Sequence, residues 1–113
     1  MKLVLCGLWS VHAEDYYKIA ISHAGVEVIG VYDNCPTRLS AFVETYGTPA
    51  MTMEEMLTCG ADGAIVCTST DSHTDVICAV AEAGMNIFTE KVLALTSAEC
   101  ERIAAAGDRY GMR

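Results

Sequence analysis

Short apolar runs alternate with longer segments whose apolar residues recur at helical spacing. Each run has the length of a buried strand, and the second is rich in β-branched residues. Strands that alternate with helices are typical of βαβ units, and hence of a parallel sheet with helices on both faces. The predicted strands are Leu3–Cys6, Val26–Tyr32, Ala50–Met51, Gly63–Cys67 and Asn86–Thr89.

Polar residues and glycines at the segment ends delimit the helices. Asp33 or Asn34 can cap the second helix, in which Pro36 is the first residue, and Ser72 can cap the helix that begins at His73. Thr52-x-x-Glu55 is a capping box that predicts a helix of one or two turns. The longer helices are expected over Ala13–His23 before Gly25, Pro36–Tyr46 before Gly47, His73–Ala83 before Gly84, and from the second capping box, Thr96-x-x-Glu99, to about Tyr110.

Right-handed crossovers turn this element order into a doubly wound α/β sheet with strand order 3-2-1-4-5. In such sheets ligands bind outside the carboxyl ends of the strands, where the strand order reverses. Here that switch point is the loop that begins at Gly7. The strand at Asn86–Thr89 would be an unprotected edge.

Composition narrows the class of protein. The 113 residues correspond to a single domain, and 15 acidic against 7 basic residues give a net charge of −8. An acidic chain without a basic cluster argues against nucleic acid and anionic membranes as partners. No apolar run reaches the length of a signal-peptide core or a membrane span.

The six cysteines show neither C-x-x-C spacing nor an accompanying His-x-x-x-His. We therefore expect reduced thiols, no metal site and a cytoplasmic protein.

The first candidate site is the turn in CGLWSVHAEDYY, which follows the first strand. A dinucleotide loop carries G-x-G-x-x-G, whereas this chain has Gly7, then Trp9, then His12 in the same register. Gly7 keeps the tight-turn role, while Trp9 and His12 bring bulk where phosphate and helix approach closely. The residues leave open whether Gly7, Leu8, Trp9 and His12 bind a cofactor or form a plain strand–helix turn. In a cofactor site, Trp9 should turn out of the phosphate path or form a wall of the pocket.

An acid and an arginine follow the second strand. Asp33 lies 26 residues after Gly7, close to where a dinucleotide fold places the acid that binds the adenosine ribose. Such an acid favours NAD over NADP, because it repels a 2′-phosphate. Asp33 can equally cap the helix at Pro36, and Arg38 is a weaker candidate for a phosphate clamp.

Two further loops carry polar side chains at the same edge of the sheet. Thr68, Ser69 and Thr70 can contact a cofactor ribose or phosphate, or simply cap the next helix, which His73 begins. Glu90 and Lys91 follow the last strand, where a lysine can orient a substrate hydroxyl or share its proton. A solvated surface pair is the alternative.

Taken together, these segments resemble the N-terminal domain of the Gfo/Idh/MocA family of NAD(P)-dependent oxidoreductases, which includes glucose–fructose oxidoreductase and inositol dehydrogenase. The resemblance covers nearly all of the chain and rests on the order and spacing of its pieces. These are Val28–Asp33, Ala41–Gly47, Glu54–Leu57, Asp62–Thr68, Ser72–His73, Ala83–Lys91 and Leu95–Thr96.

The resemblance implies roles for several residues. Asp33 would be the ribose acid, Thr68 to Ser72 would line the nicotinamide side with His73 starting the helix, and Glu90-Lys91 would match the family's Glu-Lys-Pro. In that motif the lysine sits beside the nicotinamide and contributes to substrate binding or catalysis. Val92 replaces the proline, so the peptide bond before it need not be cis.

The function implied is hydride transfer between NAD, or NADP, and a sugar- or polyol-like substrate. The family's C-terminal α/β domain, which supplies much of the substrate pocket, lies outside these 113 residues. We therefore expect a Rossmann-like cofactor-binding half that is not fully active alone. The alternative is a truncated or degenerate, non-catalytic module that associates with other copies through its open sheet edge.

Overall fold

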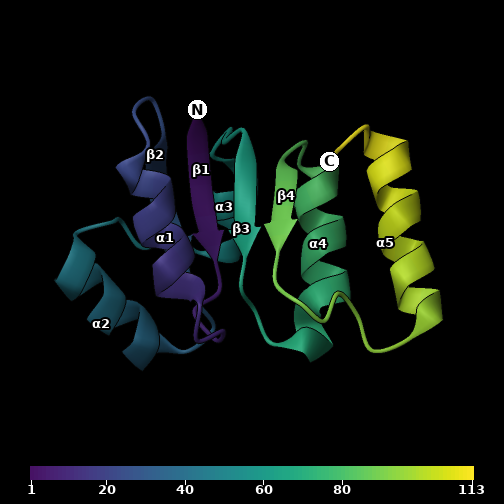
Figure 1. Ribbon diagram of the computed structural model, residues 1–113, viewed down its shortest axis with the longest axis horizontal. Helices are drawn as coiled ribbons and strands as arrows, with labels where there is room; N and C mark the ends of the chain where they lie inside the picture. Colours follow the sequence, from purple (N-terminus) through teal and green to yellow (C-terminus); the bar gives the residue numbers. More distant parts are fainter.

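The computed structural model describes all 113 residues and contains a parallel sheet flanked by helices (Figure 1). The strands are β1 (Lys2–Cys6), β2 (Glu27–Tyr32), β3 (Gly63–Val66) and β4 (Asn86–Thr89). The helices are α1 (Ala13–Ser22), α2 (Pro36–Tyr46), α3 (Met53–Thr58), α4 (His73–Glu82) and α5 (Ser97–Tyr110), with a short 3-10 turn η1 (Thr70–Ser72) before α4.

The sheet has four strands in the order β2-β1-β3-β4, and every pair is parallel. The doubly wound α/β fold predicted from the sequence is thereby confirmed, but its strand at Ala50–Met51 is wrong. That segment makes only an isolated bridge. The Val31 amide donates to the Pro49 carbonyl, and the Val31 carbonyl accepts from the Met51 amide. Thr52 then caps α3 immediately, so the extended segment has no length left to continue along β2.

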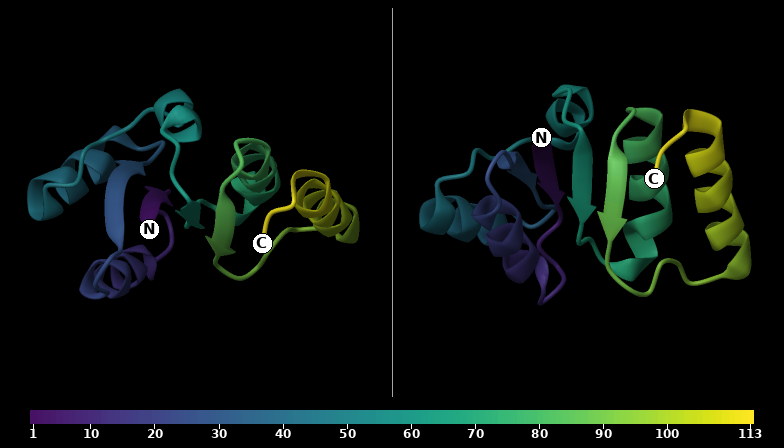
Figure 2. Two further views of the ribbon diagram at one scale, coloured as in Figure 1. Left: turned by 90° about the horizontal axis from the view of Figure 1, so that it is seen from above. Right: turned by 45° about the horizontal axis from the view of Figure 1, so that its top comes forward.

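Helices cover both faces of the sheet (Figure 2). Along β1, Val4 and Cys6 belong to the apolar cluster shared with α3 and α4, whereas Leu5 belongs to the cluster shared with α1 and α2. This alternation is the two-residue period of a strand buried on both faces. It makes β1 the central element of the fold.

Local capping follows the sequence only in part. Both predicted capping boxes form, Thr52 with Glu55 and Thr96 with Glu99. Neither Asp33 nor Asn34 occupies the N-cap of α2, which is Cys35 without a side-chain cap. Ser72 makes no capping bond either, because its hydroxyl donates back to the Ser69 carbonyl within η1.

The edge of β4 is not bare, contrary to the sequence prediction. The amide of Ile87 donates to the carbonyl of Arg113 at 2.6 Å, and the amide of Arg113 donates to the Asn86 side chain at 3.1 Å. The last residue of the chain therefore lies beside β4 and occupies part of its hydrogen-bonding edge.

The close packing of Gly7 leads to a stability prediction. Gly7 has φ +95°, and a Cβ there would lie 2.6 Å from the Thr68 amide nitrogen and 2.8 Å from the Cys67 carbonyl carbon. Gly84 has a similar φ of +84° but nothing within 4 Å. We expect Gly7→Ala to cost roughly 3–5 kcal/mol in urea unfolding, and Gly84→Ala only roughly 1–2 kcal/mol. Equal costs would show that the contact with β3 does not constrain the fold.

Candidate functional site at the carboxyl edge of the sheet

Because all four strands are parallel, the loops that follow them meet at one edge of the sheet. Gly7 follows β1, Asp33 follows β2, Thr68 follows β3 and Glu90 follows β4. The chain moves from β1 to one side and later to the other, so the strand order reverses between β1 and β3. This is the place where open α/β sheets bind ligands.

The loop after β1 is tied to the strands on both sides. The Gly7 amide donates to the Tyr32 carbonyl at the end of β2 at 2.7 Å, and the Ser10 amide donates to the Cys67 carbonyl after β3 at 3.1 Å. Gly7 also packs directly against Thr68. The predicted tight-turn role of Gly7 is therefore realised at the switch point.

Trp9 and His12 both turn toward the surface. Trp9 is 55% exposed and lines a hollow of about 470 Å³ between α1 and α2. Leu8 and Arg38 also line it, but none of the expected residues after β3 or β4 does. His12 is exposed, with its ring nitrogen 3.7 Å from the Asp15 carboxylate. Trp9 thus forms a wall of the α1–α2 hollow, which the predicted residues after β3 and β4 do not line.

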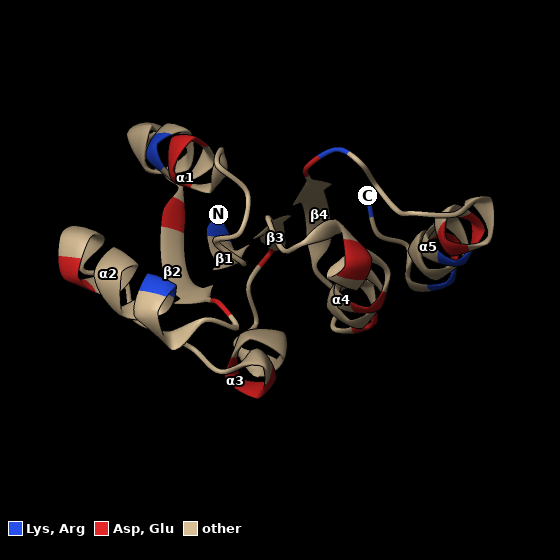
Figure 3. Cartoon of the chain, turned by 90° about the horizontal axis from the view of Figure 1, so that it is seen from below, with Lys and Arg blue, Asp and Glu red and all other residues tan.

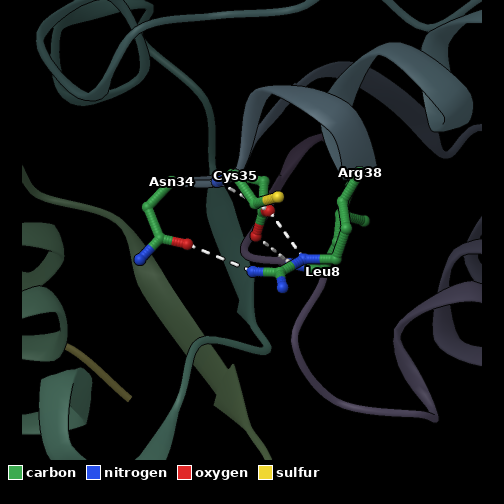
Figure 4. A network of polar contacts seen from close by, with 5 residues as sticks. Leu8, Asn34, Cys35 and Arg38 are labelled. Carbon is green, nitrogen blue, oxygen red and sulfur yellow. Dashed lines mark hydrogen bonds and ion pairs between the residues drawn. The ribbon is translucent and has the colours of Figure 1, made fainter.

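A polar network with Leu8, Asn34, Cys35 and Arg38 lies at this edge (Figure 4), and three of its bonds end on the Asp33 carboxylate. The Asp33 side chain is 2% exposed and accepts from the Leu8 amide at 2.8 Å, from the Cys35 amide at 3.1 Å and from Nε of Arg38 at 2.9 Å. One carboxylate therefore joins the loop after β1 to the start of α2.

Arg38 closes this network on the solvent side. Its guanidinium also donates to the Asn34 side chain at 3.2 Å, and its side chain is 41% exposed. The hydrogen bond to the Asp33 carboxylate raises the pKa of Arg38 further above its ordinary value. The arginine is held over the acid and yet exposed enough to swing away.

The predicted cofactor residues after β3 differ in their burial and in their hydrogen bonds. Thr68 is close to Gly7, and its hydroxyl is buried without a hydrogen-bond partner. Ser69 and Ser72 bond to each other, and Thr70 begins η1. His73 is only 1% exposed, so it lies beneath the loops and not at the surface of the edge.

His73 supports the segment after β4. Its Nδ1 lies 2.9 Å from the Val92 carbonyl and 3.2 Å from the Leu93 carbonyl, and its Nε2 is buried without a partner. The neighbouring Lys91–Val92 peptide bond is cis, a form that the sequence left open because Val92 is not proline.

Glu90 and Lys91 are not a simple surface pair. The Tyr16 hydroxyl of α1 donates to the Glu90 carboxylate, and the Tyr16 ring packs edge-on against Phe88 at 5.0 Å between centroids. That hydrogen bond is the main cause that lowers the pKa of Glu90. Lys91 is exposed at the same edge.

Sequence reasoning missed three contributors to this edge: Tyr16, Ser10 and Asn34. Tyr16 and Ile19 have the spacing of one helix face, but Ile19 is 57% exposed. Helical periodicity cannot reveal which strand a half-buried tyrosine reaches, because that depends on the crossover. Ser10 acts through its backbone amide, which bonds to the Cys67 carbonyl. Asn34 acts through its side chain, which accepts from Arg38 four residues later.

Charges and metal ligands give no other candidate site. Basic residues are spread over separate elements with acidic residues nearby (Figure 3). No three His, Cys, Asp or Glu side chains come together in a way that could hold a metal, and all six cysteines are unpaired. No helix combines the length and apolarity needed to cross a bilayer.

Comparisons with known proteins agree with this geometry. A sequence profile described as the oxidoreductase family with an NAD-binding Rossmann fold (GFO_IDH_MocA) matches residues 1–113. The inositol 2-dehydrogenase of Salmonella typhimurium is 28% identical over 117 residues, which cover 100% of this chain and 35% of that protein. The inositol 2-dehydrogenase of Rhizobium meliloti is 32% identical over 89 residues, 78% of this chain and 26% of that protein. The chain thus spans about a quarter to a third of the length of the curated relatives it matches.

Solved structures show the same fold. The WlbA dehydrogenase of Bordetella pertussis, in complex with NADH and UDP-GlcNAcA, superposes with a TM-score of 0.90 at 24% identity, over 100% of this chain and 33% of that one. The biliverdin reductase of Synechocystis, in complex with biliverdin and NADP+, gives 0.89 at 17% identity, over 98% and 35%. The match of the profile from the first residue to the last, on a parallel sheet with an acid at the end of β2, places this chain in the Gfo/Idh/MocA family of oxidoreductases as an NAD-binding Rossmann domain.

Proposed function

We propose that these 113 residues are the cofactor-binding half of an NAD-dependent oxidoreductase that acts on a sugar- or polyol-like substrate. The Asp33 network carries the proposal, because it places a buried, well-oriented carboxylate at the end of β2 beside the loop after β1. The inositol dehydrogenases among the relatives support a polyol as the substrate class. The rest of the catalytic apparatus would lie outside the chain described here.

The residues of this edge fit a dinucleotide at its adenosine end. A carboxylate offers about four acceptor positions, of which the three hydrogen bonds to Asp33 fill three. One position is left for a ribose hydroxyl, and a second becomes free when Arg38 swings out. Asp33 would therefore bind the ribose diol without giving up the Leu8 amide that shapes the loop.

The residues next to Asp33 extend this fit toward the phosphates. The hydroxyl of Thr68 is buried beside Gly7 and has no partner, which is a costly state that a ribose or phosphate oxygen would relieve. The loop after β1 and the start of α1 would lie against the pyrophosphate, while the Gly7 and Leu8 amides stay bonded to Tyr32 and Asp33. Trp9 is 55% exposed and lines the hollow between α1 and α2 together with Leu8 and Arg38, next to this path.

The cofactor, when bound, accepts or donates the hydride. With the adenosine at Asp33 and the phosphates at the loop after β1, its nicotinamide would extend toward the ends of β3 and β4. There the exposed Lys91 would orient the substrate hydroxyl and hold or pass its proton. Glu90 would support Lys91 and not contact the substrate itself, since its carboxylate is already bound to Tyr16.

The choice between the two nicotinamide cofactors tests the role of Asp33. We expect the chain to bind NAD more tightly than NADP, because the acid repels a 2′-phosphate. Asp33→Asn should lower NAD affinity by roughly tenfold and shrink the preference, since it removes the charge but keeps one acceptor. Isothermal titration calorimetry with both cofactors measures this. No binding of either at millimolar concentration would favour the non-catalytic module.

Arg38 should shift the same preference in the opposite direction. Arg38→Gln frees an acceptor on Asp33 and removes the cation nearest to a 2′-phosphate, so the ratio of NAD to NADP affinity should rise by roughly fivefold. Lys18→Gln is the matched control, because Lys18 also lines the α1–α2 hollow but does not touch Asp33. An unchanged ratio in Arg38→Gln, or an equal rise in Lys18→Gln, would contradict this assignment.

A further inference from the structure

One side chain of α1 reaches across the sheet to its far strand. Tyr16 lies on the helix that starts at the phosphate-side loop, while its partners Phe88 and Glu90 lie at the end of β4. In the sheet, β3 separates β1 from β4. The Tyr16 contacts therefore connect the two halves of the fold on either side of the switch point.

The segment that Tyr16 holds is also anchored to the neighbouring strand β3 and to α4. The Glu90 amide donates to the Val66 carbonyl at 3.4 Å, and the Thr89 hydroxyl donates to the same carbonyl at 3.3 Å. On the α4 side, His73 binds the carbonyls of Val92 and Leu93. Lys91 is the exposed residue between these anchors, so its backbone has little freedom to move.

We propose that Tyr16 is a positioning residue that fixes Lys91, through the Glu90 carboxylate, at the place where the nicotinamide end of the dinucleotide binds. The inference rests on the proposed function, because it needs the cofactor to lie along this edge. It adds that α1, the helix after the loop at the phosphate side, supports the nicotinamide side. The adenosine side, held by Asp33, does not depend on the Tyr16–Glu90 bond.

The protonation states suit this role. The hydrogen bond to Glu90 is the main cause that raises the pKa of Tyr16 to about 12, so the phenol stays a donor at neutral pH. The same bond is the main cause that lowers the pKa of Glu90, so the carboxylate stays an acceptor, with His12 and Lys91 nearby as further lowering influences.

Two ligands that differ only at the nicotinamide end test the inference. NADH carries the nicotinamide, whereas ADP-ribose shares the adenosine, the pyrophosphate and the second ribose. We expect Tyr16→Phe to weaken NADH binding by about fivefold, the usual effect of one hydrogen bond, and to leave ADP-ribose binding within about twofold. Tyr46→Phe is the matched control: it removes a tyrosine–carboxylate bond from α2 to Glu14 of α1, away from β4.

The outcomes are distinguishable. If wild type binds neither ligand, the proposed function is wrong and this inference with it. If wild type binds NADH but Tyr16→Phe binds it equally well, or weakens both ligands alike, Tyr16 does not position the nicotinamide side. A double-mutant cycle tests whether Tyr16 acts through Glu90. Adding Tyr16→Phe to Glu90→Ala should cause no further loss of NADH affinity, and additive losses would overturn the coupling.

The stability of the pair should depend on pH. A Glu90 pKa below its ordinary value of 4.5 stabilises the fold above that value, and this contribution is lost as the pH falls through the lowered pKa. The gap in unfolding free energy between wild type and Tyr16→Phe should therefore be larger at pH 7 than at pH 3, by urea denaturation. Tyr17→Phe, which loses a bond to the hydroxyl of Thr48, should show a gap that does not change with pH. A pH-independent gap for Tyr16→Phe would argue against an ionised partner.

Discussion

The close contact between Gly7 and the end of β3 is the constraint on which the rest of the site depends. With no Cβ and a positive φ, Gly7 lets the chain leave β1 and turn directly over Thr68, and the Ser10 amide then bonds to the carbonyl of Cys67. This brings the start of α1 to the switch point of the sheet. A bulkier residue would push the loop away from β3, and both the Leu8 amide and Tyr16 would lose their positions.

A second organising contact is the Asp33 carboxylate, which turns the ends of β1 and β2 into one unit. A buried charge of this kind is tolerated only when it is paired and hydrogen-bonded, and two backbone amides and an arginine bind it here. The same carboxylate therefore supports the loop and offers a ribose-binding acceptor. Tyr16 and Glu90 play the corresponding structural part on the β4 side, so the edge is supported from both halves of the fold.

Much of the architecture could be predicted from the sequence, because β-branched runs, glycines and capping boxes are local signals. The two capping boxes were of this kind, and the handedness rule for crossovers then gave the order of the four strands. The failures arose where the outcome depends on contacts distant in sequence. Ala50–Met51 formed one bridge because α3 begins at once, Asp33 bonded to Leu8 in place of capping α2, and Arg113 reached the edge of β4. For the site, Asp33 and Glu90 were identifiable from their position after a strand, whereas their partners were not.

The central claim is that a dinucleotide lies along the carboxyl edge of this sheet, from Asp33 to Lys91. Backbone amide chemical shifts of the isotope-labelled chain, titrated with NADH, test it most directly. We expect perturbations that begin at Leu8, Cys35 and Thr68 and extend to Lys91, with the amides of the opposite strand ends unchanged. Perturbations confined to the α1–α2 hollow around Trp9 and Phe42, or none at millimolar NADH, would contradict it.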